Sequence, residues 1–305
     1  MENKKLIVIL GPTASGKSEL AVKLAKKFNG EIISADSRQV YKGMDIGTGK
    51  FTKKEMKGIP HYLLDVASPK RRFTVVQYRK LALKAIDKIL RKGKVPILCG
   101  GTGFYIQAVV NGIVIPEVKP DWKLRKELEK KTVEELFNQL KKLDPQRAKT
   151  IEQKNKRRLI RALEIVKKIG PVPISRKRPL SYPVLMIGIK REKEELKKLI
   201  KRRFLKWLKQ GLITEVKNLK KSGLSWEKIE DFGIHYRIVA QYIQKKINYQ
   251  EMIENSLKEL QNYAKRQMVW FKRDKRIHWI KNQKEVEKLI RSFLENKNSP
   301  SSLEI

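Results

Sequence analysis

Short apolar runs alternate with helical patterns in the first hundred residues of the chain. Residues 6–10, LIVIL, form a continuous apolar run with the length of a strand that is buried on both faces. A glycine-rich turn follows, and then Leu20, Leu24 and Phe28 recur at helical spacing. The pattern therefore predicts a strand, a loop and a helix, which is the start of a βαβ unit.

Two further apolar runs continue this pattern. Residues 31–35 end at an acid, Asp36, and residues 95–101, VPILCGG, follow a helical segment and end in a glycine pair. Strands that alternate with helices predict an α/β fold, in which helices flank both faces of a parallel sheet. Ligands bind such sheets beyond the carboxyl ends of the strands. The loops after the three runs should therefore converge on one crevice: residues 11–18, 36–41 and 100–105.

The pattern changes near Pro116, where long and highly charged helical stretches begin. A proline-rich break, GPVPISRKRPLSYP, precedes another apolar run, VLMIGI, which looks like a strand that returns to the first sheet. These changes predict three parts: an α/β core from residues 1–115 and 181–290, a helical insertion at 116–180, and a disordered tail at 291–305.

The charge of the chain points to a polyanionic partner. Its 305 residues include 71 Lys and Arg against 32 Asp and Glu, a formal net charge of +39, and residues 141–210 alone hold 24 basic against 6 acidic residues. Such a field concentrates phosphate backbones, so nucleic acid is the leading partner. A Lys-rich surface inherited from a thermophilic or AT-rich background is the alternative, although Glu has not risen in step with Lys.

Other features of the composition indicate a cytoplasmic protein with no membrane segment. The one cysteine, Cys99, has no partner for an intrachain disulfide, which favours a reducing compartment. The first residues lack a leader pattern, and no stretch of 18 apolar residues occurs. His61, His235 and His278 are scattered, so no structural metal site is expected.

Residues 11–18, GPTASGKS, match the phosphate-binding pattern G-x-x-x-x-G-K-[ST] between the expected strand and helix. In such a loop successive main-chain N–H groups cradle phosphate oxygens at the positive end of the helix. Lys17 would add a charge, and the Ser18 hydroxyl could hold Mg²⁺. The loop predicts a diphosphate or triphosphate ligand; an ordinary turn is the alternative. Its other expected contacts are Gly11, Thr13, Ala14, Ser15 and Gly16.

The loop alone does not define the reaction. Nucleoside-triphosphate hydrolases usually place a metal-binding Asp at the end of an apolar strand. Here Asp65 follows only two leucines, and VPILCGG ends in glycines. This counts against an ordinary hydrolase. A kinase for a small molecule or nucleotide, and a nucleic-acid-binding ATPase or passive RNA-binding module, are the alternatives to the assignment below.

Several motifs together resemble the tRNA dimethylallyltransferase (isopentenyltransferase) family. GPTASGKS, SADSRQVYKGMDIGTGK at residues 34–50 and GKVPILCGGTGFY at 93–105 occur in the family's order, and DPQRAKTI, RRLIRALE, GLITEV and YAKRQMVWFKR extend the match over nearly the whole chain. The resemblance implies a P-loop-type α/β transferase with an inserted helical domain that binds the tRNA anticodon stem-loop. It also implies a reaction that moves the dimethylallyl group of dimethylallyl diphosphate to N6 of adenosine 37. The tRNAs would be those that read codons beginning with U, and Mg²⁺ would be the cofactor.

The resemblance assigns roles to residues of the expected crevice. Asp36 matches the family's general base, although by its sequence alone it could equally be a turn or helix-cap residue. Thr102 matches a position that contacts tRNA near the reacting adenine. Arg203 lies on an apolar helical ladder, where it either reaches solvent or, as the resemblance implies, binds the diphosphate. Three residues after the base complete a tRNA-contacting stretch: Ser37, Arg38 and Gln39.

Six positions of the insertion correspond to tRNA contacts in relatives: Arg125, Arg157, Arg158, Leu159, Ile160 and Arg161. In RRLIRALE the arginines alternate with apolar residues, so one helix face could pack while the other stays basic. A basic face that is merely solvated is the alternative. The reacting adenine must leave its stack to reach the donor, and the enzyme is expected to be a monomer.

The chain departs from the family pattern at a few positions. Phe51 replaces a usual Pro, Leu199 an Arg one turn before Arg203, and Ile169 a Thr, while FGIHYR around His235 is a variant of a more frequent GY[KR] stretch. The change at Leu199 would weaken diphosphate binding or leave more of the diphosphate charge to be neutralised by Lys17. None of the changes falls on a residue expected to act in catalysis.

Overall fold

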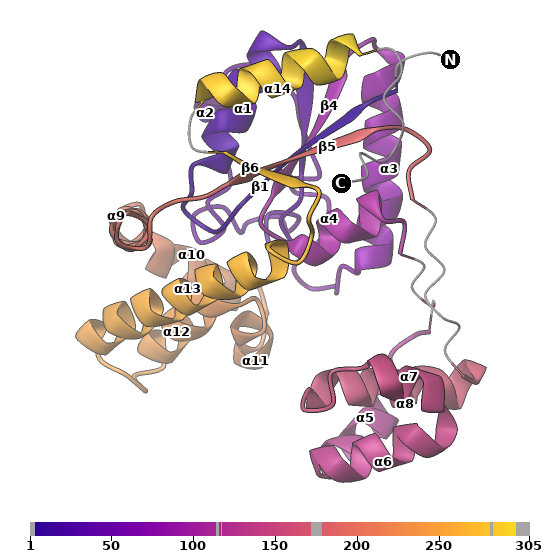
Figure 1. Ribbon diagram of the computed structural model, residues 1–305. Coiled ribbons are helices and arrows are strands. Elements are labelled where there is room, and N and C mark those ends of the chain that lie inside the picture. The colour runs from indigo at the N-terminus through magenta and orange to yellow at the C-terminus, as the bar shows by residue number, and fades with distance from the viewer. Residues whose placement is uncertain (1–3, 114–115, 117, 172–178, 281–282, 297–305) are drawn as a thin grey trace. The chain divides into compact units, whose positions relative to one another are not determined.

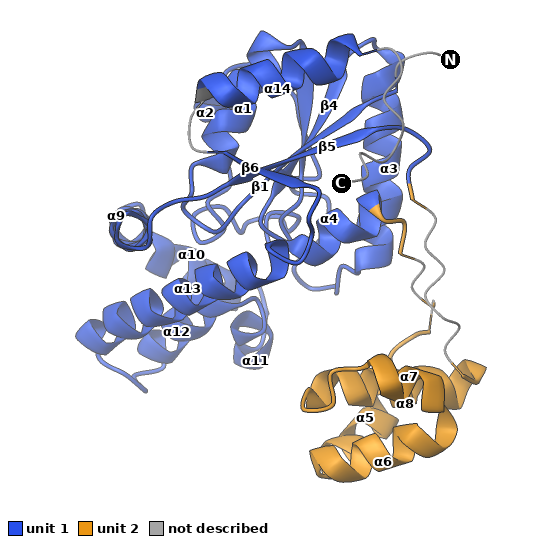
Figure 2. Ribbon diagram, viewed as in Figure 1, with its two compact units in different colours: residues 1–110, 180–305 blue, residues 111–179 orange. Residues whose placement is uncertain are grey.

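The computed structural model describes residues 4–113, 116, 118–171, 179–280 and 283–296. These residues form two compact units, residues 1–110 with 180–305 and residues 111–179 (Figure 2). No helix among the described residues is both long and apolar enough to cross a membrane.

Unit 1 is built on a six-stranded parallel sheet with the order β3-β2-β4-β1-β5-β6. This confirms the predicted α/β fold, and the run VLMIGI returns to the sheet as β5 beside β1. The strands are β1 Leu6–Leu10, β2 Gly30–Ser34, β3 His61–Tyr62, β4 Val95–Gly100, β5 Val184–Ile189 and β6 Ile277–Ile280.

Alternate residues of β1 explain why helices cover both faces of this sheet (Figure 1). Ile7 and Ile9 are fully buried among side chains of α1 (Lys17–Lys27) and α14 (Gln283–Glu295). Leu6, Val8 and Leu10 are fully buried on the opposite face, which α3 (Val75–Arg91) and α4 (Gly103–Val110) cover. Side chains of a strand alternate between faces, so an unbroken apolar run is required where both faces are packed.

A group of helices, α9 to α13, completes unit 1 and joins the core on the α3 side of the sheet (Figure 1). They are α9 Lys193–Lys209, α10 Leu212–Lys221, α11 Trp226–Glu230, α12 Ile234–Ile243 and α13 Tyr249–Phe271, and a short α2 spans Lys53–Met56. α13 leads into β6 and contacts both α4 and α9.

Unit 2 is a helical insertion between α4 and β5. It contains α5 Trp122–Glu129, α6 Val133–Leu143, α7 Pro145–Thr150 and α8 Lys156–Ile169. Each helix begins at a residue whose side chain accepts a main-chain N–H: Asp121, Thr132, Asp144 and Asn155. An apolar core of its own, with Leu136, Leu140 and Leu163 fully buried, holds these helices together.

The C-terminal part of the chain differs from the sequence prediction. Helix α14 continues to Glu295, so residues 291–295 are helical and not part of a disordered tail. Val286 and Ile290 are fully buried against the sheet, and this packing extends the helix into a segment whose polar composition suggested a tail. The remainder of the expected tail, residues 297–305, lies outside the described residues.

Candidate active site

The phosphate-binding loop lies between β1 and α1, as its sequence predicted. Gly16 caps α1 with a left-handed backbone, φ 87°, which glycine adopts without a steric penalty. The Ser15 side chain is fully buried, and its hydroxyl has no hydrogen-bond partner among the described residues. Lys17 Nζ donates to the main-chain oxygen of Pro12 at 3.2 Å, which holds the ammonium group over the loop. The loop therefore combines a glycine-dependent turn, a buried hydroxyl without a partner among the described residues and a nearby ammonium group, which are features of a phosphate site.

A second cation reaches the same loop from α9. The guanidinium of Arg203 donates to the hydroxyl of Thr13 and stacks on Trp207, with its central carbon 4.7 Å from the ring centroid. Burial, and next the charge of Arg203, lower the pKa of Lys17 to about 8; burial lowers the pKa of Arg203 to about 10. Two cationic side chains are thus held close together and partly shielded from solvent. A bound anion would relieve the repulsion between them.

Asp36 begins a turn directly after β2. Its Oδ1 accepts hydrogen bonds from the main-chain N–H of Arg38 at 2.8 Å and of Gln39 at 3.3 Å. Oδ2 receives no hydrogen bond from the part of the chain that the structure describes. Burial lowers the pKa of Lys17 and of Arg203, and the nearby negative charge of Asp36 offsets part of that lowering in each. One oxygen of the carboxylate therefore fixes the turn, which is the structural role that the sequence allowed, and Oδ2 is left without a hydrogen bond from the described residues.

The turn after β4 brings Thr102 next to the Asp36 turn. The main-chain N–H of Thr102 donates to the oxygen of Ala35 at 3.1 Å, and its hydroxyl accepts from the N–H of Ser37 at 3.1 Å. This approach requires glycine at position 100, because a Cβ there would lie 2.2 Å from the oxygen of Ala35. The three loops that were expected to converge are thus joined at one edge of the sheet.

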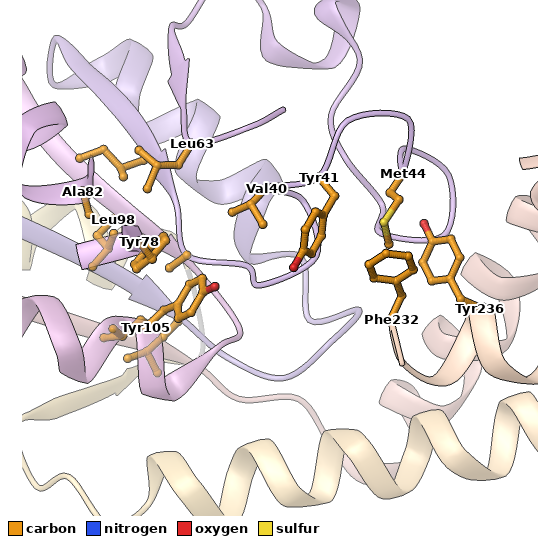
Figure 3. Packing of buried hydrophobic residues seen from close by; sticks show 14 of the residues in the cluster. Val40, Tyr41, Met44, Leu63, Tyr78, Ala82, Leu98, Tyr105, Phe232 and Tyr236 are labelled. Atoms are coloured by element: carbon orange, nitrogen blue, oxygen red, sulfur yellow. The ribbon is translucent and has the colours of Figure 1, made fainter. Parts of the chain in front are cut away.

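Buried aromatic residues keep the Asp36 turn in place (Figure 3). Val40 and Tyr41 continue the turn into the core, where the ring of Tyr41 lies 5.2 Å from that of Phe232. On the other side, Tyr105 stacks on Tyr78 at 3.8 Å, and the Tyr78 hydroxyl donates to the oxygen of Ser34 at 2.9 Å. The carboxylate is therefore carried by a rigid turn.

The Gln39 side chain bonds within the protein. Its Oε1 accepts from the hydroxyl of Ser34 at 2.8 Å, and its Nε2 donates to the main-chain oxygens of Thr48 and Gly49. These bonds connect the Asp36 turn to the following loop. The side chain expected to contact tRNA thus has a structural partner at each of its polar atoms.

Three residues near the site were not assigned a role from the sequence. Gln267 of α13 bonds to Thr13 and Gly101, and Arg191 donates to the main-chain oxygen of Ser15 at 3.2 Å. Glu215 of α10 accepts from three consecutive main-chain N–H groups at residues 45–47 and from the hydroxyl of Tyr236. Gln267 and Glu215 lie in the motifs YAKRQMVWFKR and GLITEV, so the motifs marked them without indicating what they contact.

In unit 2 the arginines expected to bind tRNA fall into two groups. Arg125 pairs with the buried carboxylate of Glu164 through Nε and Nη2, at 2.8 and 2.7 Å, and Arg161 binds the same carboxylate. Burial opposes the ionised form of Glu164, but hydrogen bonds from Arg125, the Asp121 N–H and Arg161 outweigh it and lower its pKa to about 2. Arg157 and Arg158 are exposed.

The two apolar positions expected at the tRNA surface are buried. Leu159 is 0% exposed and Ile160 is 6% exposed, and both belong to the core of unit 2. Their side chains pack between the helices of that unit and offer no surface to an RNA. The match to relatives marked the whole segment 157–161, whereas only the side chains of Arg157 and Arg158 in this segment are exposed.

The loop offers one possible ligand for a Mg²⁺ ion, the hydroxyl of Ser18. Ser18 places its hydroxyl in the first turn of α1, directly after Lys17, and Mg²⁺ commonly binds through one such group together with phosphate oxygens and water. Among the described residues no group of three or more His, Cys, Asp or Glu could form a protein cage for a metal. Asp65 is paired with Lys50 at 2.7 Å.

Together these features define a P-loop α/β protein in which a phosphate-binding loop, two cations and a carboxylate meet at one edge of a parallel sheet. The IPP transferase family model matches residues 39–274 of the chain. The chain belongs to this family, which confirms the resemblance read from its motifs.

Individual relatives cover nearly the whole chain. The tRNA dimethylallyltransferase of Acetivibrio thermocellus is 42% identical over 90% of this chain and 91% of its own length. The tRNA dimethylallyltransferase of Halothermothrix orenii is 40% identical over 96% of this chain and 94% of its own length.

Among solved structures, the full-length tRNA isopentenylpyrophosphate transferase from Bacillus halodurans matches with a TM-score of 0.73 at 37% identity, over 97% of this chain and 98% of that one. A eukaryotic dimethylallyltransferase described as acting on tRNA matches with a TM-score of 0.75 at 32% identity. The match covers 88% of this chain and 70% of that one.

Proposed function

We propose that this protein transfers a dimethylallyl group from dimethylallyl diphosphate to N6 of adenosine 37 in tRNAs that read codons beginning with U. The products are N6-(dimethylallyl)adenosine and diphosphate. The observation that carries the proposal is the meeting of Lys17, Arg203 and the available carboxylate oxygen of Asp36. Membership of the IPP transferase family supports it.

The donor diphosphate binds the loop at residues 11–18. Main-chain N–H groups of this loop bond to the phosphate oxygens, and Lys17 and Arg203 neutralise the charge that grows as the allylic C–O bond breaks. Thr13, whose hydroxyl already accepts from Arg203, links the loop to that second cation. Mg²⁺, which Ser18 would hold through its hydroxyl, supplies further positive charge to the leaving diphosphate when it is bound.

The acceptor amine lies between Asp36 and Thr102. N6 of the adenine attacks the allylic carbon, a C–N bond forms, and the C–O bond to the diphosphate breaks. The amine loses one proton, which Oδ2 of Asp36 accepts because Oδ1 is engaged in the turn. The Thr102 hydroxyl accepts from the Ser37 N–H and donates to the Ser37 hydroxyl over 3.5 Å, and it turns this proton to a polar atom of the base when the acceptor binds.

The tRNA contacts come from both units. We assign Ser37, Arg38 and Thr102 to the extruded adenine and its neighbours, and Arg157 and Arg158 to the phosphates of the anticodon stem. Arg125 and Arg161 support this surface through Glu164. We also propose that the enzyme acts as a monomer.

The test is to incubate the purified protein with Mg²⁺, an unmodified tRNA and either dimethylallyl diphosphate labelled in its prenyl group or ATP labelled in its γ-phosphate. Prenyl label is expected in the tRNA, at adenosine 37 by nucleoside mass spectrometry. Transfer of label from ATP would indicate a kinase. Phosphate release without prenylation would indicate an ATPase. Either outcome contradicts the proposal.

A further inference from the structure

The side chain of Gln267 joins the two halves of the proposed site. Its Oε1 accepts from the main-chain N–H of Thr13 at 2.8 Å, and its Nε2 donates to the main-chain oxygen of Gly101 at 2.8 Å. Thr13 belongs to the phosphate-binding loop, and Gly101 directly precedes Thr102. One amide from α13 therefore spans the distance between the donor loop and the acceptor turn.

The chemistry of the two partners fixes how this amide is oriented. A main-chain N–H can only donate and a carbonyl oxygen can only accept, so the Gln267 oxygen must face Thr13 and its nitrogen Gly101. Gln267 is only 6% exposed. Loss of the amide would leave a buried donor and a buried acceptor unpaired, which costs more than the net gain from an ordinary hydrogen bond.

The contact with Gln267 requires that residue 101 has no side chain. A Cβ at position 101 would lie 2.5 Å from Nε2 of Gln267 and 3.6 Å from Cε of Lys17, so any other residue would displace the amide. The bonds continue on both sides of Gln267. Thr13 accepts from Arg203 on the donor side, and the hydroxyl of Thr102 accepts from Ser37 on the acceptor side.

We propose that Gln267 is a positioning residue that sets the spacing between the diphosphate loop and the turns of Thr102 and Asp36. This inference rests on the proposed function. The amine nitrogen must reach the allylic carbon on the side opposite the departing diphosphate, and a misplacement of about 1 Å can cost about 100-fold in rate. Gln267 therefore controls the transfer step more than the binding of either substrate.

Two substitutions separate hydrogen bonding from packing. Gln267→Met keeps an unbranched side chain of similar length and loses both bonds. Gln267→Glu keeps the acceptor for Thr13, but it donates to Gly101 only while its carboxyl group is protonated. Gln250→Met is the matched control, because Gln250 is an exposed residue in the first turn of the same helix. Each variant is checked for a wild-type thermal unfolding transition.

The charged groups around position 267 are shared by both variants. Lys17 from α1 lies beside the same glycine, Gly101, and the charges around Tyr263, one turn earlier on α13, are those of Asp36, Arg38, Arg203 and Arg266. The ratio of the Glu variant to the Met variant at each pH therefore isolates the introduced carboxyl group.

Single-turnover prenylation, tRNA Kd and donor KM are measured for all four proteins across pH. Gln267→Met should lower the single-turnover rate by about tenfold or more, with tRNA Kd and donor KM changed less than about threefold. The Glu to Met rate ratio should fall as pH rises, because the ionised carboxylate cannot donate to Gly101. Gln250→Met should match the wild type.

Two results would overturn the inference: a Gln267→Met rate within about twofold of the wild type, or losses confined to Kd or KM with a flat Glu to Met ratio. Its failure is distinguishable from that of the proposed function. If the wild-type protein transfers no prenyl group, the proposed function fails. If it does and the Gln267 variants transfer equally well, only the positioning role fails.

Discussion

The main-chain N–H of Ser37 donates a hydrogen bond of 3.1 Å to the side-chain oxygen of Thr102. The bond joins the turn after β2 to the turn after β4, and these two strands are neighbours in the sheet. Because the Thr102 oxygen accepts from Ser37, the hydroxyl proton remains for a second partner, and the Ser37 hydroxyl lies 3.5 Å away. This bond and the bond from the Thr102 N–H to the oxygen of Ala35 hold the two turns of the proposed acceptor site together.

Replacing Thr102 tests this contact. Thr102→Val keeps the shape but leaves the Ser37 N–H without its acceptor, and we expect the single-turnover prenylation rate to fall about tenfold or more. Thr102→Ser retains the hydroxyl and should stay within a few-fold of the wild type. Equal rates for the Val and Ser variants would show that the hydroxyl has no role.

The lowered pKa of Lys17 predicts a pH dependence for donor binding. Burial and the charge of Arg203 bring this pKa to about 8, so the ammonium group is charged below that pH and neutral above it. Because only the charged form attracts the diphosphate, kcat/KM for dimethylallyl diphosphate should fall as pH rises through about 8. Lys17→Arg should move this fall to higher pH. A wild-type profile that stays flat well above pH 8 contradicts the prediction.

Arg158 is expected to contribute to RNA binding through its charge. Its side chain is 51% exposed and pairs with the exposed Glu152 at 3.2 Å. Arg158→Ala should weaken tRNA binding and reduce the slope of log K against log salt concentration by about 1. Binding titrations at several salt concentrations measure this slope, and an unchanged slope would place Arg158 outside the interface.

Arg125 should behave differently, although it belongs to the same predicted set. Its guanidinium pairs with a carboxylate, Glu164, whose side chain is 0% exposed. Arg125→Ala should therefore destabilise unit 2, by about 1.5 to 3 kcal/mol, because it removes hydrogen bonds to a buried charge while Arg161 still pairs with that charge. Urea unfolding of the Arg125 and Arg158 variants separates the two roles, since only the former should unfold earlier. Equal stability of the two variants would contradict a structural role for Arg125.

Local patterns made much of the fold predictable. The apolar runs of β1 and β5 are buried on both faces. Such strands can be recognised from their own residues, without knowing which strands pair with them. The phosphate-binding loop depends on residues 11–18 alone. The glycine pair at 100 and 101 marked a close approach, but the sequence did not say to what.

The remaining features depend on contacts between distant parts of the chain. Gln267 meets Thr13 from 254 positions away, and no local pattern distinguishes it from a solvated glutamine on a helix. Arg125 and Arg161 look like exposed cations until α5 and α8 pack together and Glu164 is buried between them. For the same reason, the motif RRLIRALE could not separate its two exposed arginines from its structural one.

The most direct test of the central claim is the single-turnover rate of Asp36→Asn on an anticodon stem-loop RNA with labelled dimethylallyl diphosphate. Asparagine keeps an oxygen for the N–H groups of Arg38 and Gln39, so the turn is preserved while the base is lost. We expect the Kd for this stem-loop RNA to stay within about threefold of the wild-type value, and the rate to fall about 100-fold or more. A variant that prenylates the RNA at the wild-type rate would contradict the assignment of Asp36 as the group that accepts the amine proton.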